Sequence, residues 1–202
     1  MKTDSIFTSL IIIGSYFFGS ISPSYLVCKW FKGVDIRTIG DKNPGAANIS
    51  KIMGSAPAFI IAFIDFCKGI IPIFIAKSLN ISLPYLMLTG LATVAGHDWS
   101  IFLNFKGGKG TLTSLGTLIF LLPFETLIAF SVWLFIHYII KIRFIGSFIT
   151  FLLIPFLTGL ISCRLEGKPG YLLFFPSGIL FLFLVRMPEN IKNFFSKKDS
   201  QI

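Results

Sequence analysis

"PAFIIAFIDFCKGIIPIFIAK", residues 57–77, is the stretch that decides the fold of this 202-residue chain. A helix of this length rises about 30 Å, which matches the hydrocarbon core of a bilayer. Before Lys77 it is interrupted by two charged residues, Asp65 and Lys68. The pattern is typical of a transmembrane helix that carries one buried polar spot.

The composition extends this interpretation to the whole chain. Hydrophobic residues make up 54% and charged residues 13%, and the mean hydropathy is +0.81. A soluble domain carries about 25% charged residues. We therefore expect one all-α integral membrane domain, residues 1–202, with about seven transmembrane helices. The expected spans are 6–28, 57–77, 82–103, 111–123, 125–140, 144–163 and 171–185.

The boundary between the fourth and fifth spans depends on Pro123 and Glu125, the main break in the apolar run 111–140. A proline followed by an acid predicts a tight turn near the membrane interface. A single long kinked span is the alternative.

Basic residues set the expected orientation. Cytoplasmic loops of membrane proteins carry an excess of Lys and Arg. With seven spans, an outer N-terminus and a cytoplasmic C-terminus, 13 of the 18 basic residues fall in cytoplasmic segments. These 13 are Lys29, Lys32, Arg37, Lys42, Lys51, Lys106, Lys109, Lys141, Arg143, Arg186, Lys192, Lys197 and Lys198.

Composition also bears on cofactors and partners. The net charge of +9 is explained by basic loops facing anionic lipid and an anionic substrate, so no nucleic acid is expected. Cys28, Cys67 and Cys163 lie far apart, without a CxxC pair or a histidine neighbour. We therefore expect no metal, no cofactor and no disulfide, and buried apolar roles for the cysteines.

"FKGGKGT", residues 105–111, is a polar island before the fourth span. Glycines let backbone N–H groups converge on an anion, and Lys106 and Lys109 add positive charge. The helix that begins at Thr111 presents its N-terminus to the same point. The island predicts a phosphate cradle, and a flexible basic turn at the interface is the alternative.

"DIRTIGDKNPGAANISKIMG", residues 35–54, is another polar island, which we call the first island because it comes earlier in the chain; residues 105–111 are the glycine-rich island. Small residues from Gly45 onward allow close backbone approach, and Asn43 and Asn48 offer amide groups. Arg37 can hold a phosphate with its planar fork or pair with Asp35 as a structural clamp, and we favour the clamp.

Asp65, Lys68 and His97 are ionisable residues within the expected spans. Asp65 and Lys68 are spaced i,i+3, and we expect them to pair with each other. His97 precedes the glycine-rich island. It fits a general base, and it fits a capping or packing role equally well.

Six motifs along the chain resemble the bacterial acyl-phosphate:glycerol-3-phosphate acyltransferases, the PlsY family, in order and spacing. The resemblance implies a seven-span inner-membrane enzyme whose active site faces the cytosol. Such an enzyme transfers an acyl group from acyl phosphate to glycerol 3-phosphate, makes lysophosphatidic acid for phospholipid synthesis, and requires neither metal nor acyl-CoA. The motifs are "GSISPSYL" (19–26), "DIRTIGDKNPGAAN" (35–48), "DFCKGIIP" (65–72), "GHDWSIFLNFKGGKGT" (96–111), "RFIGS" (143–147) and "PENIKNFF" (188–195).

Together the resemblance and the residues suggest three groups of site residues. The expected catalytic residues are Lys109, Ser147 and Asn190. Expected structural or orienting residues are Asp35, Arg37, Asp65, Lys68 and His97. Those expected to bind substrate phosphate are Asp41, Asn43, Gly45, Asn48, Lys51, Lys106, Gly107, Gly108 and Gly110.

Four positions depart from the family pattern. Asp41 stands where the family has serine, Lys42 where it has glycine, Lys51 where it has arginine, and Met187 where it has histidine. These changes concern the part of the site that holds the acceptor. Two alternatives follow: transfer to a different acceptor, or a non-catalytic protein that binds lipid phosphates. Catalysis without the histidine is possible if the acceptor's own phosphate serves as the base.

Overall fold

The computed structural model describes the backbone of residues 5–140 and 143–199, and the side chains of residues 5–136 and 146–186. Throughout these residues the regular structure is helical. The chain forms two compact units, Met1–Thr117 and Leu118–Ile202, and the boundary lies inside helix α6. We call them the first and second units.

The first unit carries both polar islands. Its long helices are α1 (Ser5–Ser20), α4 (Ser55–Ser78) and α5 (Leu83–Asp98), and it includes most of α6 (Thr111–Leu121). Two shorter helices, α2 (Pro23–Lys32) and α3 (Ala46–Met53), flank the first island. Single 3-10 turns are η1 (Ile36–Thr38) and η2 (Ile101–Leu103).

Local sequence explains the break between α1 and α2. Ser22 caps α2, since its Oγ accepts a hydrogen bond from the Tyr25 N–H at 3.3 Å, and Pro23 occupies the first helical position. Gly33, at φ +71°, ends α2 in the left-handed conformation. The chain then turns into the first island.

Small residues let α1 and α5 pack with their backbones in contact. A Cβ added at Gly19 would collide with the carbonyl of Thr93, and one at Gly96 would collide with the carbonyl of Tyr16. Close helix packing through small residues is the usual device in membranes, where the hydrophobic effect does not drive helices together. This contact fixes the C-terminal end of α5, where the glycine-rich island begins.

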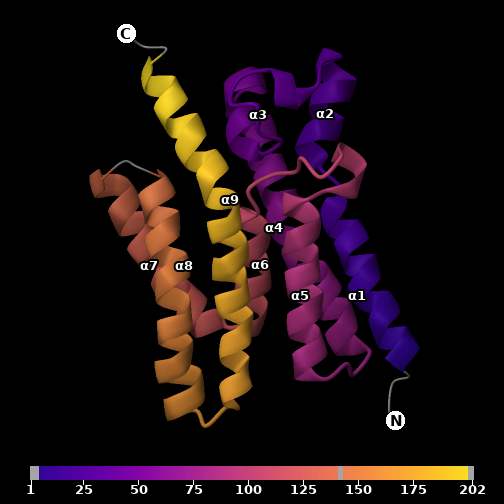
Figure 1. Ribbon diagram of the computed structural model, residues 1–202, viewed down its shortest axis with the longest axis vertical. Coiled ribbons are helices and arrows are strands. Elements are labelled where there is room, and N and C mark those ends of the chain that lie inside the picture. Colours follow the sequence, from indigo (N-terminus) through magenta and orange to yellow (C-terminus); the bar gives the residue numbers. More distant parts are fainter. Residues whose placement is uncertain (1–4, 141–142, 200–202) are drawn as a thin grey trace. The chain divides into compact units, whose positions relative to one another are not determined.

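A small apolar core lies beneath the first island. Cys28, Ile36, Ile49, Ala58 and Ile61 are all buried there. These residues come from α2, η1, α3 and α4, so the first island packs against a buried apolar cluster. Figure 1 shows α2, α3 and the segment after α5 at one end of the first unit, where α1 and α5 both end.

The second unit contains α7 (Pro123–Ile140), α8 (Arg143–Thr158), a π-helical segment η3 (Gly159–Leu165), the turn η4 (Gly170–Leu173) and α9 (Phe174–Asp199). Helix α6 ends at Leu121 and α7 begins at Pro123, so the predicted break in the apolar run is confirmed. Glu125 is buried in the first turn of α7 and accepts a hydrogen bond from Ser162 Oγ at 2.5 Å.

The helices have the lengths and surfaces of membrane spans. Within the residues that the structure describes, four stretches are long and apolar enough to cross a bilayer: Ser5–Lys32, Ser55–Ser78, Leu83–Leu103 and Gly146–Leu165. Three shorter apolar helices are Thr111–Leu121, Pro123–Ile136 and Gly170–Arg186. Each coincides with one expected span, and α4 exposes large side chains such as Phe59 and Phe63. The chain is thus a helical membrane protein; the count of seven crossings and the orientation stay predictions.

Candidate functional site

The buried amide of Asn48 organises the first island. Its Oδ1 accepts from the Asp41 N–H at 2.7 Å, and its Nδ2 donates to the carbonyls of Ile36 (3.1 Å) and Ile39 (3.0 Å). Gly40, at φ +58°, lies so close that a Cβ would collide with Asn48 Oδ1. Both amide hydrogens are therefore used within the loop, and no amide donor of Asn48 is left for the predicted contact with phosphate.

Arg37 joins the first island to η2, the turn that precedes the glycine-rich island. Its Nε and Nη2 donate to the carboxylate of Asp35, with an Nη2–Oδ2 distance of 2.7 Å. Its Nη1 donates to the carbonyl of Leu103 at 2.8 Å. The guanidinium also lies over the ring of Tyr25, 5.4 Å from its centre. The expected Asp35–Arg37 pair is present, and Nε, Nη1 and Nη2 of Arg37 each donate to a protein oxygen.

The same contact shifts both ionisable groups. The hydrogen bond from Arg37 lowers the pKa of Asp35 below its ordinary value of 3.8, and the hydrogen bond to Asp35 raises the pKa of Arg37. Since the folded protein holds Asp35 ionised more strongly than the unfolded chain does, the pair stabilises the fold above pH 3.8. This contribution is lost as the pH falls through the lowered pKa.

We expect the thermal midpoint of the wild-type protein in detergent to fall as the pH drops below about 4. Asp35→Asn should have a lower midpoint at neutral pH and a weaker dependence on pH in that range, because no carboxylate remains to be protonated. Scanning fluorimetry between about pH 3 and pH 7 measures the thermal midpoint of each protein and its dependence on pH. Glu166→Gln, at an exposed ion pair of the second unit, is the control. Equal pH slopes for Asp35→Asn and wild type would contradict the prediction.

The glycine-rich island is docked onto the C-terminal end of α5. The Gly107 N–H donates to the carbonyl of Asp98 at 3.2 Å, and the Gly108 N–H donates to the carbonyl of His97 at 2.9 Å. A Cβ on Gly108 would collide with the His97 ring, and one on Gly110, at φ +63°, would collide with the Asp98 carboxylate.

These contacts change the expected cradle. The N–H groups of Gly107 and Gly108 point to α5 and do not converge on an outside anion. The part of the island suited to phosphate is its end, where Lys109 and Gly110 lead into the first turn of α6 at Thr111. Lys106 is exposed and Lys109 is half-buried.

A buried polar cluster supports the island from within. Lys68 Nζ lies 3.1 Å from Asp65 Oδ1, so the expected pair is present. Lys68 Nζ also donates to the carbonyls of Gly19 (3.1 Å), in the last turn of α1, and Ile21 (2.9 Å), directly after α1. One ammonium group therefore links α4 to the end of α1.

His97 belongs to the same cluster. Its Nδ1 lies 3.6 Å from Asp65 Oδ1 and 3.3 Å from Thr113 Oγ1, and Thr113 Oγ1 donates to the Asp65 carbonyl at 3.1 Å. The ring is 8% exposed and packs against Gly108. Of the two roles that the sequence allows for His97, general base or capping and packing, this geometry fits packing. Thr113, which the sequence analysis did not single out, completes the cluster from the first turn of α6.

Two of the residues that depart from the family pattern form an ion pair. Lys51 Nζ lies 2.7 Å from Asp41 Oδ1. Asn43, half-buried, precedes Gly45, which is the N-cap of α3. The first island thus neutralises one of its own cations.

The remaining expected residues belong to the second unit. Ser147 lies in the first turn of α8 and is half-buried. Asn190 and Met187 lie in α9, and their side chains fall outside the described residues. Among the side chains that are described, no three His, Cys, Asp or Glu residues gather in a way that could hold a metal ion.

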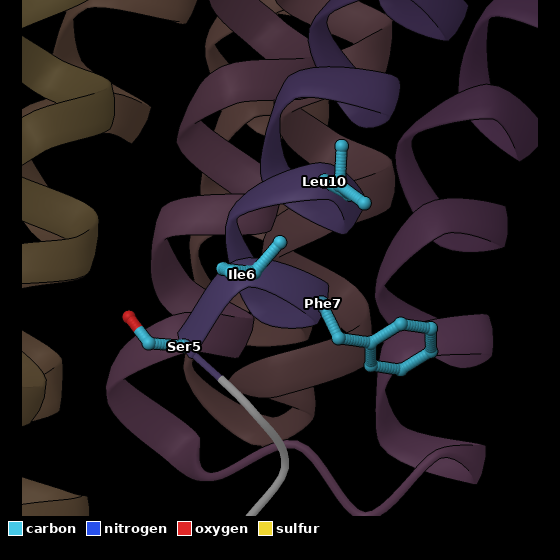
Figure 2. A pocket seen from close by; sticks show the side chains of 4 residues that line it. All are labelled: Ser5, Ile6, Phe7 and Leu10. Carbon is cyan, nitrogen blue, oxygen red and sulfur yellow. The ribbon is translucent and has the colours of Figure 1, made fainter.

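A hollow of about 430 Å³ lies at the start of α1 and is lined by Ser5, Ile6, Phe7 and Leu10 (Figure 2). Among the residues that the structure describes, no charged side chain lines it. In the first unit it lies at the opposite end of α1 from the two islands (Figure 1). An apolar surface there suits lipid and not a phosphate.

Comparison with known proteins identifies relatives over the whole chain. The sequence profile of the family described as "Glycerol-3-phosphate acyltransferase" matches residues 9–197. The chain is 36% identical to "Glycerol-3-phosphate acyltransferase 2" of Thermotoga maritima, covering 96% of this chain and 95% of the relative. It is 37% identical to the glycerol-3-phosphate acyltransferase of Geotalea daltonii, covering 91% of each.

Two crystal structures share the fold. Both are of PlsY, described as an integral membrane glycerol 3-phosphate acyltransferase, one in the glycerol 3-phosphate form and one in the lysophosphatidic acid form. Their TM-scores to this chain are 0.82 and 0.81, with 34% sequence identity, and they cover 94% of this chain and 92% of the solved chain.

Proposed function

This chain belongs to the glycerol-3-phosphate acyltransferase family, and we propose on that premise that it uses acyl phosphate to acylate glycerol 3-phosphate in a bacterial inner membrane. The activity itself, a glycerol-3-phosphate acyltransferase, follows from membership. The observation that carries the proposal is the likeness, in sequence and in fold, to PlsY in its glycerol 3-phosphate form. These comparisons favour this acceptor over a different one, and an enzyme over a binding protein.

The proposed reaction is a single acyl transfer. A hydroxyl oxygen of glycerol 3-phosphate attacks the carbonyl carbon of the acyl phosphate, and the bond from that carbon to the phosphate oxygen breaks. Lysophosphatidic acid and inorganic phosphate are formed. Because Met187 can neither accept nor donate a proton, the hydroxyl proton passes to the acceptor's own phosphate.

The roles that we propose for the two lysines of the glycine-rich island follow from their positive charge. Lys109 stabilises the negative charge that grows on the departing phosphate, at the N-terminus of α6, and Lys106 attracts the anionic substrates. Ser147 and Asn190 are proposed as catalytic residues on the basis of the resemblance alone. The structural support for a common phosphate site is the hydrogen bond from Arg37 to the carbonyl of Leu103, which ties the first island to η2, the turn that precedes the glycine-rich island.

Charge distribution supports a cytoplasmic active site and a single domain of seven spans. Cysteine labelling tests this topology in a background with the native cysteines replaced. Thr38→Cys, in the first island, should react with an impermeant thiol reagent only from the cytoplasmic side. Gly170→Cys, after the sixth expected span, should react only from outside. Labelling from the reverse sides would contradict the orientation.

A donor and acceptor panel tests the reaction itself. Palmitoyl phosphate and palmitoyl-CoA are each supplied to the purified protein with glycerol 3-phosphate, glycerol or a hexose phosphate. We expect acylated product from palmitoyl phosphate with glycerol 3-phosphate above all other pairs. A better acceptor than glycerol 3-phosphate, or a preference for palmitoyl-CoA, would overturn the proposal.

A further inference from the structure

The Asp41–Lys51 ion pair lies in the first island, at two positions that the resemblance assigns to the part of the site that holds the acceptor. Lys51 Nζ and Asp41 Oδ1 are 2.7 Å apart, and the side chains are 49% and 23% exposed respectively. The two residues hold different positions in the fold. Asp41 is fixed by the loop, since its N–H donates to the buried Asn48. Lys51 lies in the last turn of α3, on a half-exposed side chain that can move.

We propose that Asp41 sets the affinity of this enzyme for its anionic acceptor, by competing with the acceptor's phosphate for Lys51. The inference rests on the proposed function, together with the expectation from the sequence that Lys51 binds the phosphate of the acceptor. An ammonium already paired with a carboxylate presents no net charge to an incoming dianion. The repulsion between the Asp41 carboxylate and the dianion is what offsets the attraction of the ammonium.

The structure indicates which side chain of the pair moves when phosphate binds. Because Asn48 holds the backbone of Asp41 and the Lys51 ammonium is on a long flexible stem, a bound phosphate draws the ammonium away more readily than it displaces the shorter Asp41 side chain. The cost of breaking the pair falls on binding of the acceptor, and the chemical step is unaffected. Asp41 is therefore a residue that determines affinity without taking part in the reaction.

Asp41→Asn is the direct test, because the amide keeps the shape and an acceptor oxygen but loses the charge. We expect the KM for glycerol 3-phosphate to fall about fivefold, the size expected for a partly exposed charge interaction, while kcat and the KM for palmitoyl phosphate stay unchanged. Lys51→Met should raise the KM for glycerol 3-phosphate. In the Lys51→Met background, adding Asp41→Asn should lower the KM much less, because the cation for which the two anions compete is gone.

Glu166→Gln is a matched control. It removes one carboxylate from the Glu166–Lys168 pair of the second unit, which has a distance of 2.6 Å and comparable exposure. It should leave both KM values unchanged. An active enzyme whose KM for glycerol 3-phosphate is unchanged or raised by Asp41→Asn would overturn this inference alone. A wild-type protein that makes no lysophosphatidic acid would instead overturn the proposed function on which it rests.

Discussion

Replacing Lys109 with alanine is expected to lower kcat for acyl transfer by about 100-fold or more, which is the usual loss when one group that stabilises transition-state charge is removed. The residue lies between the docked glycines and the N-terminus of α6, where a positive side chain and the helix dipole act on the same anion. Initial rates with saturating palmitoyl phosphate and glycerol 3-phosphate, in lipid nanodiscs, give kcat.

Lys32→Ala is the control for this variant, since it removes an exposed lysine at the end of α2, outside the proposed site. It should keep wild-type kcat. Thermal midpoints of both variants in detergent should match the wild type, which separates lost chemistry from lost fold. A Lys109→Ala enzyme with wild-type kcat would show that the glycine-rich island does not carry the reaction.

Lys68→Met is expected to give the largest loss of stability in the first unit. The substitution leaves Asp65 buried without its ammonium partner and removes the donor to the carbonyls of Gly19 and Ile21. Breaking a buried ion pair by removing one partner costs about 3–5 kcal/mol. We expect a much lower thermal midpoint in detergent and a low yield of folded protein.

Two further variants test this reason. Asp65→Asn added to Lys68→Met should recover part of the thermal midpoint, because the uncompensated charge is gone while the carbonyls still lack their donor. Lys77→Met, at the exposed end of the same helix, should leave the midpoint near that of the wild type. A Lys68→Met protein as stable as Lys77→Met would show that the buried cluster does not support the fold.

The sequence was informative about features that depend on near neighbours in the chain. The apolar run 57–77 corresponds to α4, Ser55–Ser78, and the break at Pro123 separates α6 from α7. The pairs Asp35–Arg37 and Asp65–Lys68 are two and three residues apart, so local geometry alone brings their charges together.

Contacts between distant segments were not predictable. The bond from Arg37 to the Leu103 carbonyl spans 66 residues, and Lys68 reaches Gly19 across 49. The glycines of the glycine-rich island were expected to let backbone N–H groups converge on an anion, whereas the atoms that lie close to Gly107, Gly108 and Gly110 belong to His97 and Asp98 of α5. Glycine indicates that something comes close, and only the packed structure shows what does.

The most direct measurement of the central claim follows both products of the purified protein in lipid, supplied with palmitoyl phosphate in the presence and absence of glycerol 3-phosphate. The account predicts that lysophosphatidic acid and inorganic phosphate appear together in equal amounts, and only when glycerol 3-phosphate is present. Phosphate release without lysophosphatidic acid, or no reaction in either case, would contradict it.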